Sequence, residues 1–238
     1  MSDPVVVYMA PRAWGIPNPS PFVVKLETWL RMAEVPYLPK LGNPLRSPRG
    51  KVPWIEWRGE TLADSQRIIE RLSRDVRDLD AHLGPADRAR GHLVRRTLEE
   101  ATYFLTFYDR WMIPENYEKV HDAFFRRMGP PGRVVGWAVR RTVRRNLWGQ
   151  GVARYTAEER ADMARADIDA IAAQLGDGPY VFGDRPTTVD AALYGFLCQL
   201  LYAPFDGPAQ LHARANPRLV AYGAGIRERH WREIPPLQ

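Results

Sequence analysis

The segment from Gly50 to Trp57 combines features that suit an extended, peptide-like ligand. Its residues after Pro53 are β-prone, and Pro53 has no backbone N–H and disfavours a helical conformation at Val52. Val52 is therefore expected to be extended, with its own amide and carbonyl free to pair with another backbone. An X-Pro bond at such a place is often cis.

A second feature is the pair Asp64-Ser65, which opens a helix indicated by apolar residues at Ile68, Ile69 and Leu72. Free N–H groups at a helix start attract a carboxylate. Asp before a helix also serves simply as an N-cap, which is the alternative interpretation. Together, the two segments predict a peptide-binding edge beside an anion site.

The elements upstream must position these segments. Val5–Tyr8 predicts a buried strand, and Ser20-Pro21 places an N-cap before a proline at the first helical position. The apolar pattern carries this helix to Ala33, and Val35–Tyr37 resumes an extended path. The expected order is β, α, β, a loop rich in proline, glycine and arginine, and then β, β and α.

This order resembles the thioredoxin-like domain of the cytosolic glutathione transferases. The motifs that resemble their glutathione site are Ser20-Pro21-Phe22, Gly50-Lys51-Val52-Pro53 and Asp64-Ser65. Thr187 to Ala192 matches the N-cap signature of the same superfamily, in which Asp190 reaches back to Thr187. The segments 20–37 and 150–159 are similar to the branch of failed-axon-connections and metaxin-like proteins, several of which are not established enzymes.

The resemblance implies that glutathione is the co-substrate, bound as an extended tripeptide. Its cysteinyl part would pair with the backbone of Val52, beside Pro53. Asp64 and Ser65 would hold its γ-glutamyl end, and Lys51 would approach its glycyl carboxylate.

Binding in this way would fix the glutathione thiol near Ser20. A helix N-terminus and a hydroxyl donor both favour the thiolate, which would then attack a small electrophile. Tyr8, at the end of the first strand, is the rival donor, because many members of the superfamily use a tyrosine near that position. Arg12 and Trp14 lie in the loop between them and would border the pocket.

The chain is expected to form two domains, an α/β thioredoxin-like domain over residues 1–83 and an all-α helical domain over 87–238, joined near Gly84. The helices predicted for the second domain span 87–111, 115–127, 133–147, 156–175, 187–201 and 217–229. Five aromatic residues at helical spacing would face the core or, alternatively, a substrate pocket; they are Tyr103, Phe104, Phe107, Tyr108 and Trp111.

Composition argues against several other classes of protein. A chain of 238 residues that is 45% hydrophobic can bury a large core. The N-terminus lacks the pattern of a signal peptide, and no apolar run approaches the ~20 residues of a membrane span, so a cytoplasmic protein is expected. Cys198 is the one cysteine and lies in an apolar helix, where a buried, inert thiol is expected. The five histidines show no ligand spacing, so no metal is expected.

Positive charge is concentrated between residues 123 and 157, which hold eight arginines and no acidic residue. Apolar residues recur every fourth position from Val135 to Leu147, which predicts a basic amphipathic helix. The arginines off this stripe are Arg140, Arg141, Arg144 and Arg145. Such a helix is either a solvated face over a buried stripe, a contact for an anionic membrane or acidic partner, or the lining of a pocket for an anionic substrate. No nucleic-acid-reading module is visible, so nucleic acid is not expected as a partner.

Two functions remain open. The first is a glutathione transferase-like enzyme that stabilises the thiolate near Ser20 and conjugates glutathione to a small electrophile, or removes it. The second is a non-catalytic interaction protein that keeps the fold and uses the basic helix for a membrane or acidic partner. The complete set of site residues favours the first, while the branch resemblance and the basic helix favour the second. The superfamily usually dimerises, which predicts a homodimer unless the inserted basic helix alters or blocks that surface.

Overall fold

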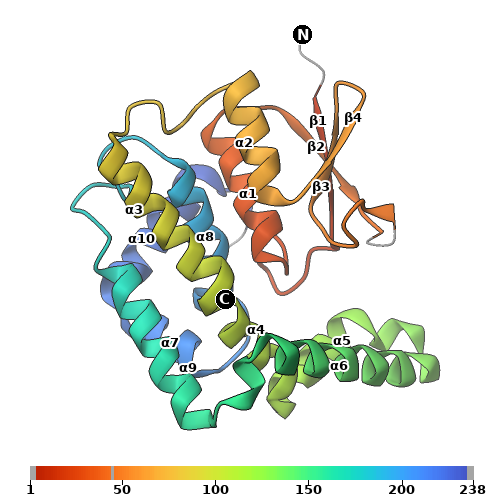
Figure 1. Ribbon diagram of the computed structural model, residues 1–238. Coiled ribbons are helices and arrows are strands. Elements are labelled where there is room, and N and C mark those ends of the chain that lie inside the picture. The colour runs from red at the N-terminus through yellow and green to blue at the C-terminus, as the bar shows by residue number, and fades with distance from the viewer. Residues whose placement is uncertain (1–3, 44–45, 235–238) are drawn as a thin grey trace.

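The computed structural model describes residues 4–43 and 46–234, and its N-terminal domain contains the predicted mixed sheet (Figure 1). The strands are β1 (Val5–Met9), β2 (Tyr37–Leu41), β3 (Trp54–Trp57) and β4 (Glu60–Ala63). Their order across the sheet is β2-β1-β3-β4. Strand β1 is parallel to β2 and antiparallel to β3, and β3 is antiparallel to β4. This is the thioredoxin-like arrangement that the sequence predicted.

Two helices cover one face of the sheet, α1 (Pro21–Met32) and α2 (Ser65–Asp75) (Figure 1). Side chains alternate between the two faces of a strand, and the helix-covered face of β1 carries the buried residues Val5, Val7 and Met9. Proline is tolerated at the first helical position because the N–H it lacks would have no partner there, and α1 begins at Pro21 as predicted.

The C-terminal domain is entirely helical in its described part. Its helices are α3 (Pro85–Arg96), a π-helical turn (Thr97–Thr102), α4 (Tyr103–Met112), α5 (Pro114–Phe124), α6 (Pro130–Gln150), α7 (Ala157–Ala172), α8 (Thr188–Leu201), α9 (Pro208–Ala215) and α10 (Pro217–His230). Single 3₁₀ turns span Arg126–Met128 and Val152–Arg154. The short helix α9 was not predicted.

Helix α8 is the centre of the molecule and joins the two domains. Its side chains are apolar on nearly all sides, so every residue from Thr188 to Leu200 is buried. Gly195 allows α1 to approach closely, since a Cβ there would lie 2.7 Å from the carbonyl oxygen of Pro21. At the start of α8, the predicted cap is confirmed: the Asp190 carboxylate accepts a hydrogen bond of 2.8 Å from the Thr187 amide.

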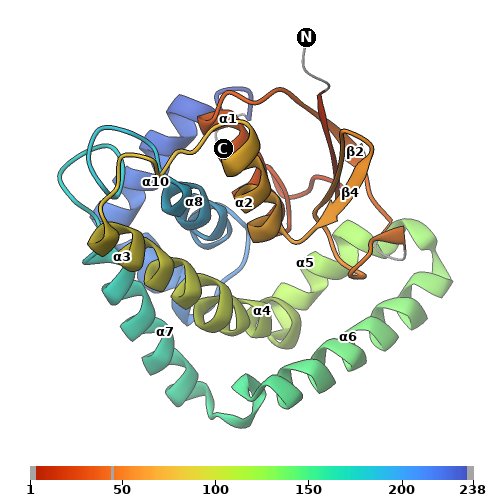
Figure 2. The same cartoon turned by 45° about the horizontal axis from the view of Figure 1, so that its top comes forward.

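Helices α5 and α6 extend away from the rest of the helical domain as a hairpin, which we call the arm (residues 114–150) (Figures 1 and 2). Figure 2 shows α6 along the outside of the molecule, with no other element over its outer side. Across the described residues, the structure contains no helix with the length and apolar character needed to cross a bilayer.

Candidate functional site

The register of the sheet brings the predicted site segments to one edge. Tyr8 of β1 pairs with Trp54 of β3, and Trp54 pairs with Ala63 of β4. The end of β1, the start of β3 and the end of β4 therefore meet. The segments attached to these three strand ends carry Ser20, Val52 and Ser65.

The edge before β3 has the free backbone that the sequence predicted. The Val52–Pro53 peptide bond is cis, and Pro53 is buried while Val52 is half-buried. Within the described part of the chain, neither the amide nor the carbonyl of Val52 has a hydrogen-bond partner. Lys51 is exposed beside it, so a positive charge is available next to the free backbone.

The start of α2 combines a capped helix with an open binding position. The Asp64 carboxylate accepts hydrogen bonds from the amides of Gln66 and Arg67, at 3.0 and 3.3 Å, so Asp64 is an N-cap. Its φ of +82° is uncommon for a residue with a side chain. The neighbouring Ser65 is 4% exposed, and its hydroxyl has no partner among the described residues. With the amides of Gln66, Arg67 and Ile68 bonded to Asp64, the Ser65 amide is the helix-start N–H left without a partner in the described chain, and together with the Ser65 hydroxyl it suits a ligand carboxylate.

Ser20 occupies the N-cap position of α1, but its side chain does not cap the helix. Its backbone amide donates to Asn18 Oδ1 at 3.1 Å, and no described residue bonds its hydroxyl. The side chain is half-buried. The Ser20 hydroxyl is thus available to a ligand at a helix N-terminus, where negative charge is favoured.

Tyr8, the rival donor, is already engaged elsewhere. It lies on the sheet face opposite α1 and α2, where its hydroxyl donates to Glu56 Oε2 at 2.9 Å. Its ring stacks on Trp54 with 4.7 Å between centroids. The hydrogen bond to the Glu56 carboxylate raises the pKa of Tyr8. This geometry favours Ser20 over Tyr8, and the choice between them stays a prediction.

The loop before α1 is anchored to the C-terminal domain by two polar contacts. Arg110 of α4 donates to the Pro19 carbonyl at 2.8 Å, and Gln199 of α8 donates to the Asn18 carbonyl at 2.8 Å. Burial lowers the pKa of Arg110 to about 10, which still leaves it protonated at neutral pH. The position of Ser20 therefore depends on both domains.

The two residues predicted to border the pocket have structural contacts. Trp14 packs edge-on against Phe124 of α5 and Phe205, with centroids 5.4 and 4.7 Å apart. Arg12 forms an ion pair of 3.0 Å with Glu27 of α1. Through Trp14, the arm contacts the loop that leads to Ser20.

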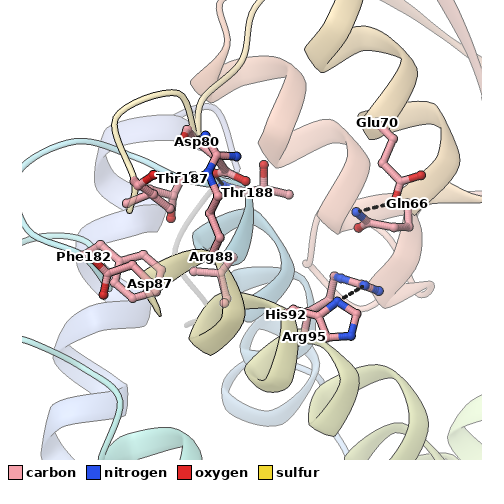
Figure 3. A pocket seen from close by; sticks show the side chains of 13 residues that line it. Gln66, Glu70, Asp80, Asp87, Arg88, His92, Arg95, Phe182, Thr187 and Thr188 are labelled. Carbon is pink, nitrogen blue, oxygen red and sulfur yellow. Dashed lines mark hydrogen bonds between the residues drawn. The ribbon is translucent and has the colours of Figure 1, made fainter. Parts of the chain in front are cut away.

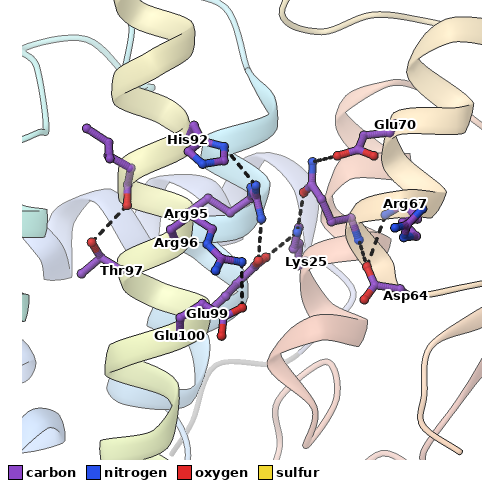
Figure 4. Close-up of polar contacts among 12 residues, drawn as sticks. Lys25, Asp64, Arg67, Glu70, His92, Arg95, Arg96, Thr97, Glu99 and Glu100 are labelled. Carbon is purple, nitrogen blue, oxygen red and sulfur yellow. Dashed lines mark hydrogen bonds and ion pairs between the residues drawn. The ribbon is translucent and has the colours of Figure 1, made fainter. Parts of the chain in front are cut away.

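A buried ionic network links α1, α2 and the C-terminal domain, and sequence reasoning missed it (Figure 4). Lys25 is fully buried and contacts Glu99 Oε1 at 2.5 Å and Gln66 Oε1 at 2.7 Å. Arg95 holds the other oxygen of Glu99 at 2.7 Å. Gln66 is adjacent to Ser65, so the network fixes the start of α2 against the other domain. The sequence signal that could have indicated this network is Lys25 itself, which directly follows the apolar run Phe22–Val24 in α1.

Glu99 belongs to the π-helical turn at residues 97–102, which interrupts the single helix that the sequence predicted there. Such turns occur mostly as local bulges within α-helices and often lie near functional sites. Here the turn carries the carboxylate that compensates the buried charge of Lys25.

The described cavities between the domains are not large apolar pockets. One of about 150 Å³ lies between α2, α3 and the start of α8, and its lining includes Asp80, Arg88 and His92 (Figure 3). None of the predicted site residues lines it. Another, beside Pro21 and Tyr103, measures about 10 Å³, which is near the space of a single water molecule. The five aromatic residues of α4 pack against the core, as expected.

Cys198 is buried as predicted, and burial raises the pKa of its thiol to about 12. A thiol with such a pKa is not a nucleophile at neutral pH. Among residues 4–43 and 46–234, no group of histidine, cysteine and carboxylate side chains is arranged to hold a metal ion.

One of the four arginines assigned to a free basic face is in fact used inside the molecule. Arg140 donates to the carbonyls of Trp111 and Met112 at 2.9 and 3.0 Å, and its guanidinium lies 4.2 Å from the centroid of the Tyr117 ring. It therefore satisfies carbonyl groups at the end of α4, which have no partner within that helix. The three that remain exposed are Arg141, Arg144 and Arg145.

The sequence matches known families over most of its length. Residues 21–116 match the glutathione S-transferase N-terminal domain, and residues 164–226 match the glutathione S-transferase C-terminal domain. The chain is 31% identical to the isoprene-epoxide–glutathione S-transferase of Rhodococcus sp. (strain AD45), over 95% of this chain and 99% of that protein.

The predicted branch resemblance is also confirmed. The chain is 29% identical to Failed axon connections of Drosophila melanogaster, over 98% of this chain and 60% of that protein. It is 26% identical to human metaxin-1, over 99% of this chain and 54% of that protein. It thus spans little more than half the length of these two relatives.

Among solved structures, the fold is similar to a glutathione S-transferase of Ceriporiopsis subvermispora in complex with glutathione. The TM-score is 0.63 at 16% identity, covering 96% of this chain and all of the other. A theta-class glutathione S-transferase of Xanthomonas axonopodis pv. citri with glutathione bound gives a TM-score of 0.59 at 18% identity, covering 100% and 99% of the two chains. The fold, the two domain matches and the full-length relative together show that the chain belongs to the glutathione S-transferase family.

Proposed function

We propose that the protein binds glutathione at the sheet edge and transfers its sulfur to a small electrophile. The observation that carries this proposal is the set of three unpartnered groups at that edge. They are the backbone of Val52, the hydroxyl of Ser65 and the hydroxyl of Ser20. These groups lie at one edge and leave their hydrogen-bonding capacity open, so one extended ligand can satisfy them together.

Each part of glutathione has a chemical counterpart at this edge. The cysteinyl backbone pairs with the amide and carbonyl of Val52. The γ-glutamyl carboxylate accepts from the Ser65 hydroxyl and from the Ser65 amide at the start of α2, while the second oxygen of Asp64 binds the γ-glutamyl ammonium. Lys51 is exposed on the side of the glycyl carboxylate.

Ser20 then acts on the sulfur. Its hydroxyl donates a hydrogen bond to the thiolate, and the N-terminus of α1 adds a partial positive charge. Together they lower the thiol pKa from its usual value of about 8.5 towards neutrality. The thiolate forms a bond to an electrophilic carbon, and the leaving atom takes the electron pair of the bond that breaks.

Epoxides are the first class of electrophile to screen, because the name of the Rhodococcus relative specifies an epoxide substrate. In that case the thiolate sulfur bonds to one ring carbon, the carbon–oxygen bond breaks, and the resulting alkoxide takes a proton from solvent. The product is a thioether that carries a neighbouring hydroxyl.

The test is a thiolate titration, in which ultraviolet absorbance of bound glutathione is followed against pH. Ser20→Ala should raise the pKa of the bound thiol to about 8.5, since the donor is lost. Tyr8→Phe should leave that pKa unchanged. The opposite pattern would show that Tyr8 donates the hydrogen bond to the thiolate. The same thiol pKa in the wild type and both variants would show that neither hydroxyl stabilises the thiolate.

A serine that lies away from the edge supplies the matched control. Ser73 is in the interior of α2, and Ser73→Ala should preserve both glutathione affinity and thiol pKa. Complete absence of glutathione binding by the wild type would contradict the enzyme and favour the non-catalytic alternative.

A further inference from the structure

One side of α6 carries two exposed tryptophans in register. Trp137 is 62% exposed and Trp148 is 57% exposed. They are eleven positions apart, which is about three helical turns, so both point to the same side of α6 at about 16 Å along its axis. Water-exposed tryptophan is uncommon on a folded surface, and two in register form a specific pattern.

Arginines share this side of the helix. Arg141 follows Trp137 by one turn, and its guanidinium lies 5.8 Å from the centroid of the Trp137 ring. Arg144 and Arg145 lie one turn further on, and both are exposed. These residues define the α6 surface: Trp137, Trp148, Arg141, Arg144 and Arg145.

The charge on the α6 surface is uncompensated. Among the described residues, Arg141, Arg144 and Arg145 form no ion pair, and the sequence has no acidic residue from 123 to 157. Val134, 68% exposed, and Met128, 48% exposed, extend the apolar area towards the tip of the arm. The arm extends from the rest of the helical domain (Figures 1 and 2), and Trp137, Arg141 and Arg144 border a hollow of about 390 Å³ that Tyr108 and Met112 of α4 also line.

We propose that the α6 surface docks the protein onto an anionic membrane. Arginine binds phosphate groups through paired hydrogen bonds, and tryptophan prefers the depth of the lipid headgroups, where one end of the ring is wet and the other apolar. A helix that carries both residue types on one side lies in the plane of the interface. The two tryptophans flank the three arginines along α6, so the rings and the guanidinium groups would reach the headgroup region together.

The docking would be peripheral and electrostatic in origin. Each arginine near an anionic surface strengthens binding by roughly fivefold, so three contribute roughly a hundredfold. Arg140 is excluded from this set because its guanidinium is committed to the carbonyls of α4. The proposal is independent of whether the glutathione site is catalytic.

Sedimentation of the full chain with lipid vesicles tests the proposal. Vesicles of phosphatidylcholine with phosphatidylserine should bind the protein, vesicles of phosphatidylcholine alone should not, and added salt should weaken binding. The triple variant Arg141→Gln, Arg144→Gln and Arg145→Gln should bind roughly a hundredfold more weakly. Its melting temperature should equal that of the wild type within about 1 °C, because these side chains form no hydrogen bond or ion pair within the described chain and the contact of Arg141 with exposed Trp137 is weak.

Three exposed arginines elsewhere provide the matched control with the same net charge. The variant Arg46→Gln, Arg74→Gln and Arg185→Gln should bind these vesicles almost as well as the wild type. Equal weakening in the two triple variants would overturn the proposal, because binding would then follow overall charge and not the α6 surface.

The tryptophans separate a membrane from other partners. Trp137→Ala with Trp148→Ala should weaken vesicle binding and leave binding to a polyglutamate peptide unchanged. If the variant with both changes binds vesicles as well as the wild type does, the surface serves an acidic protein instead. If it converts a wild-type dimer to a monomer, the surface is an interface between two copies, and the membrane proposal is wrong.

Discussion

Lys25 and the α6 surface show two opposite environments for positive charge. Lys25 is fully buried and has two partners within 2.7 Å, Glu99 and Gln66. The arginines of the α6 surface are exposed and have no ion-pair partner in the described chain. A buried charge depends strongly on its partner because desolvation is costly, whereas an exposed charge contributes little to folding. The first environment fixes the geometry of the domain contact, and the second leaves charge free for binding.

Removing the buried charge should have the largest effect. Lys25→Met leaves Glu99 buried with Arg95 as its remaining ionic partner, and should lower the free energy of unfolding by about 3 kcal/mol. Denaturant unfolding measures this loss. Adding Glu99→Gln should restore part of the stability, and a single variant as stable as the wild type would show that the ion pair does not hold the domains together.

Lys25→Met should also weaken glutathione binding, because Lys25 holds Gln66 beside Ser65. Comparing affinity well below the denaturation midpoint separates this effect from unfolding. Unchanged affinity would confine the network to a structural role.

Asp109 is a second buried charged residue, and unlike Lys25 it forms no hydrogen bond or ion pair in the described chain; the positive charge of Arg160 offsets only part of the effect of burial on its pKa. It is 7% exposed, its carboxylate has no hydrogen-bond partner among the described residues, and burial raises its pKa to about 7. The native state therefore binds more protons than the unfolded state between about pH 4 and pH 7, where stability should fall as the pH rises.

Asp109→Asn, which stays neutral, should remove this loss and be more stable than the wild type above pH 7. The difference should be on the order of a few kcal/mol at most. Thermal unfolding at a series of pH values measures it, and parallel profiles for the two proteins would show that Asp109 titrates normally.

Two glycine substitutions in α6 test how closely the two helices of the arm are packed. In Gly132→Ala, the new Cβ would lie 2.1 Å from the carbonyl oxygen of Phe125, so the hairpin between α5 and α6 must shift, at a cost of about 1–3 kcal/mol. A Cβ added at Gly149, also in α6, would have no atom within 4 Å. Gly149→Ala should therefore raise the free energy of unfolding by about 0.5–1 kcal/mol. If both variants gain the same stability, helix propensity and not close packing decides the outcome.

The smallest stability effect is expected at the α6 surface itself. Replacing Arg141, Arg144 and Arg145 by glutamine should change the free energy of unfolding by less than about 0.5 kcal/mol. A larger loss, measured by denaturant unfolding, would show that these arginines stabilise the fold. The contrast with Lys25 would then be wrong.

Much of the fold followed from local signals. The start of α1 at Pro21 and the cap of α8 at Asp190 are encoded within a few residues, whereas the isomer of the bond before Pro53 could not be read from the sequence. The free edge at Val52 follows from the same proline. What was missed depends on distant contacts: Lys25 and Glu99 are 74 positions apart, and nothing local pairs them.

The basic helix shows how a local pattern can mislead. Residues at every fourth position drift by about 40° per step around a helix of 3.6 residues per turn, so Val135 and Leu147 cannot share one face. The structure buries Leu147 and leaves Val135 37% exposed. The buried side instead begins with Gly132 and Gly136, which an apolar pattern does not detect.

The most direct test of the glutathione site is calorimetric titration of glutathione into the wild type and two serine variants of α2. The wild type and Ser73→Ala should bind saturably at millimolar concentration or below, while Ser65→Ala should bind at least about tenfold more weakly, because a charge-assisted hydrogen bond is lost. No saturable heat with the wild type, or the same affinity in all three proteins, would contradict a glutathione site at the sheet edge.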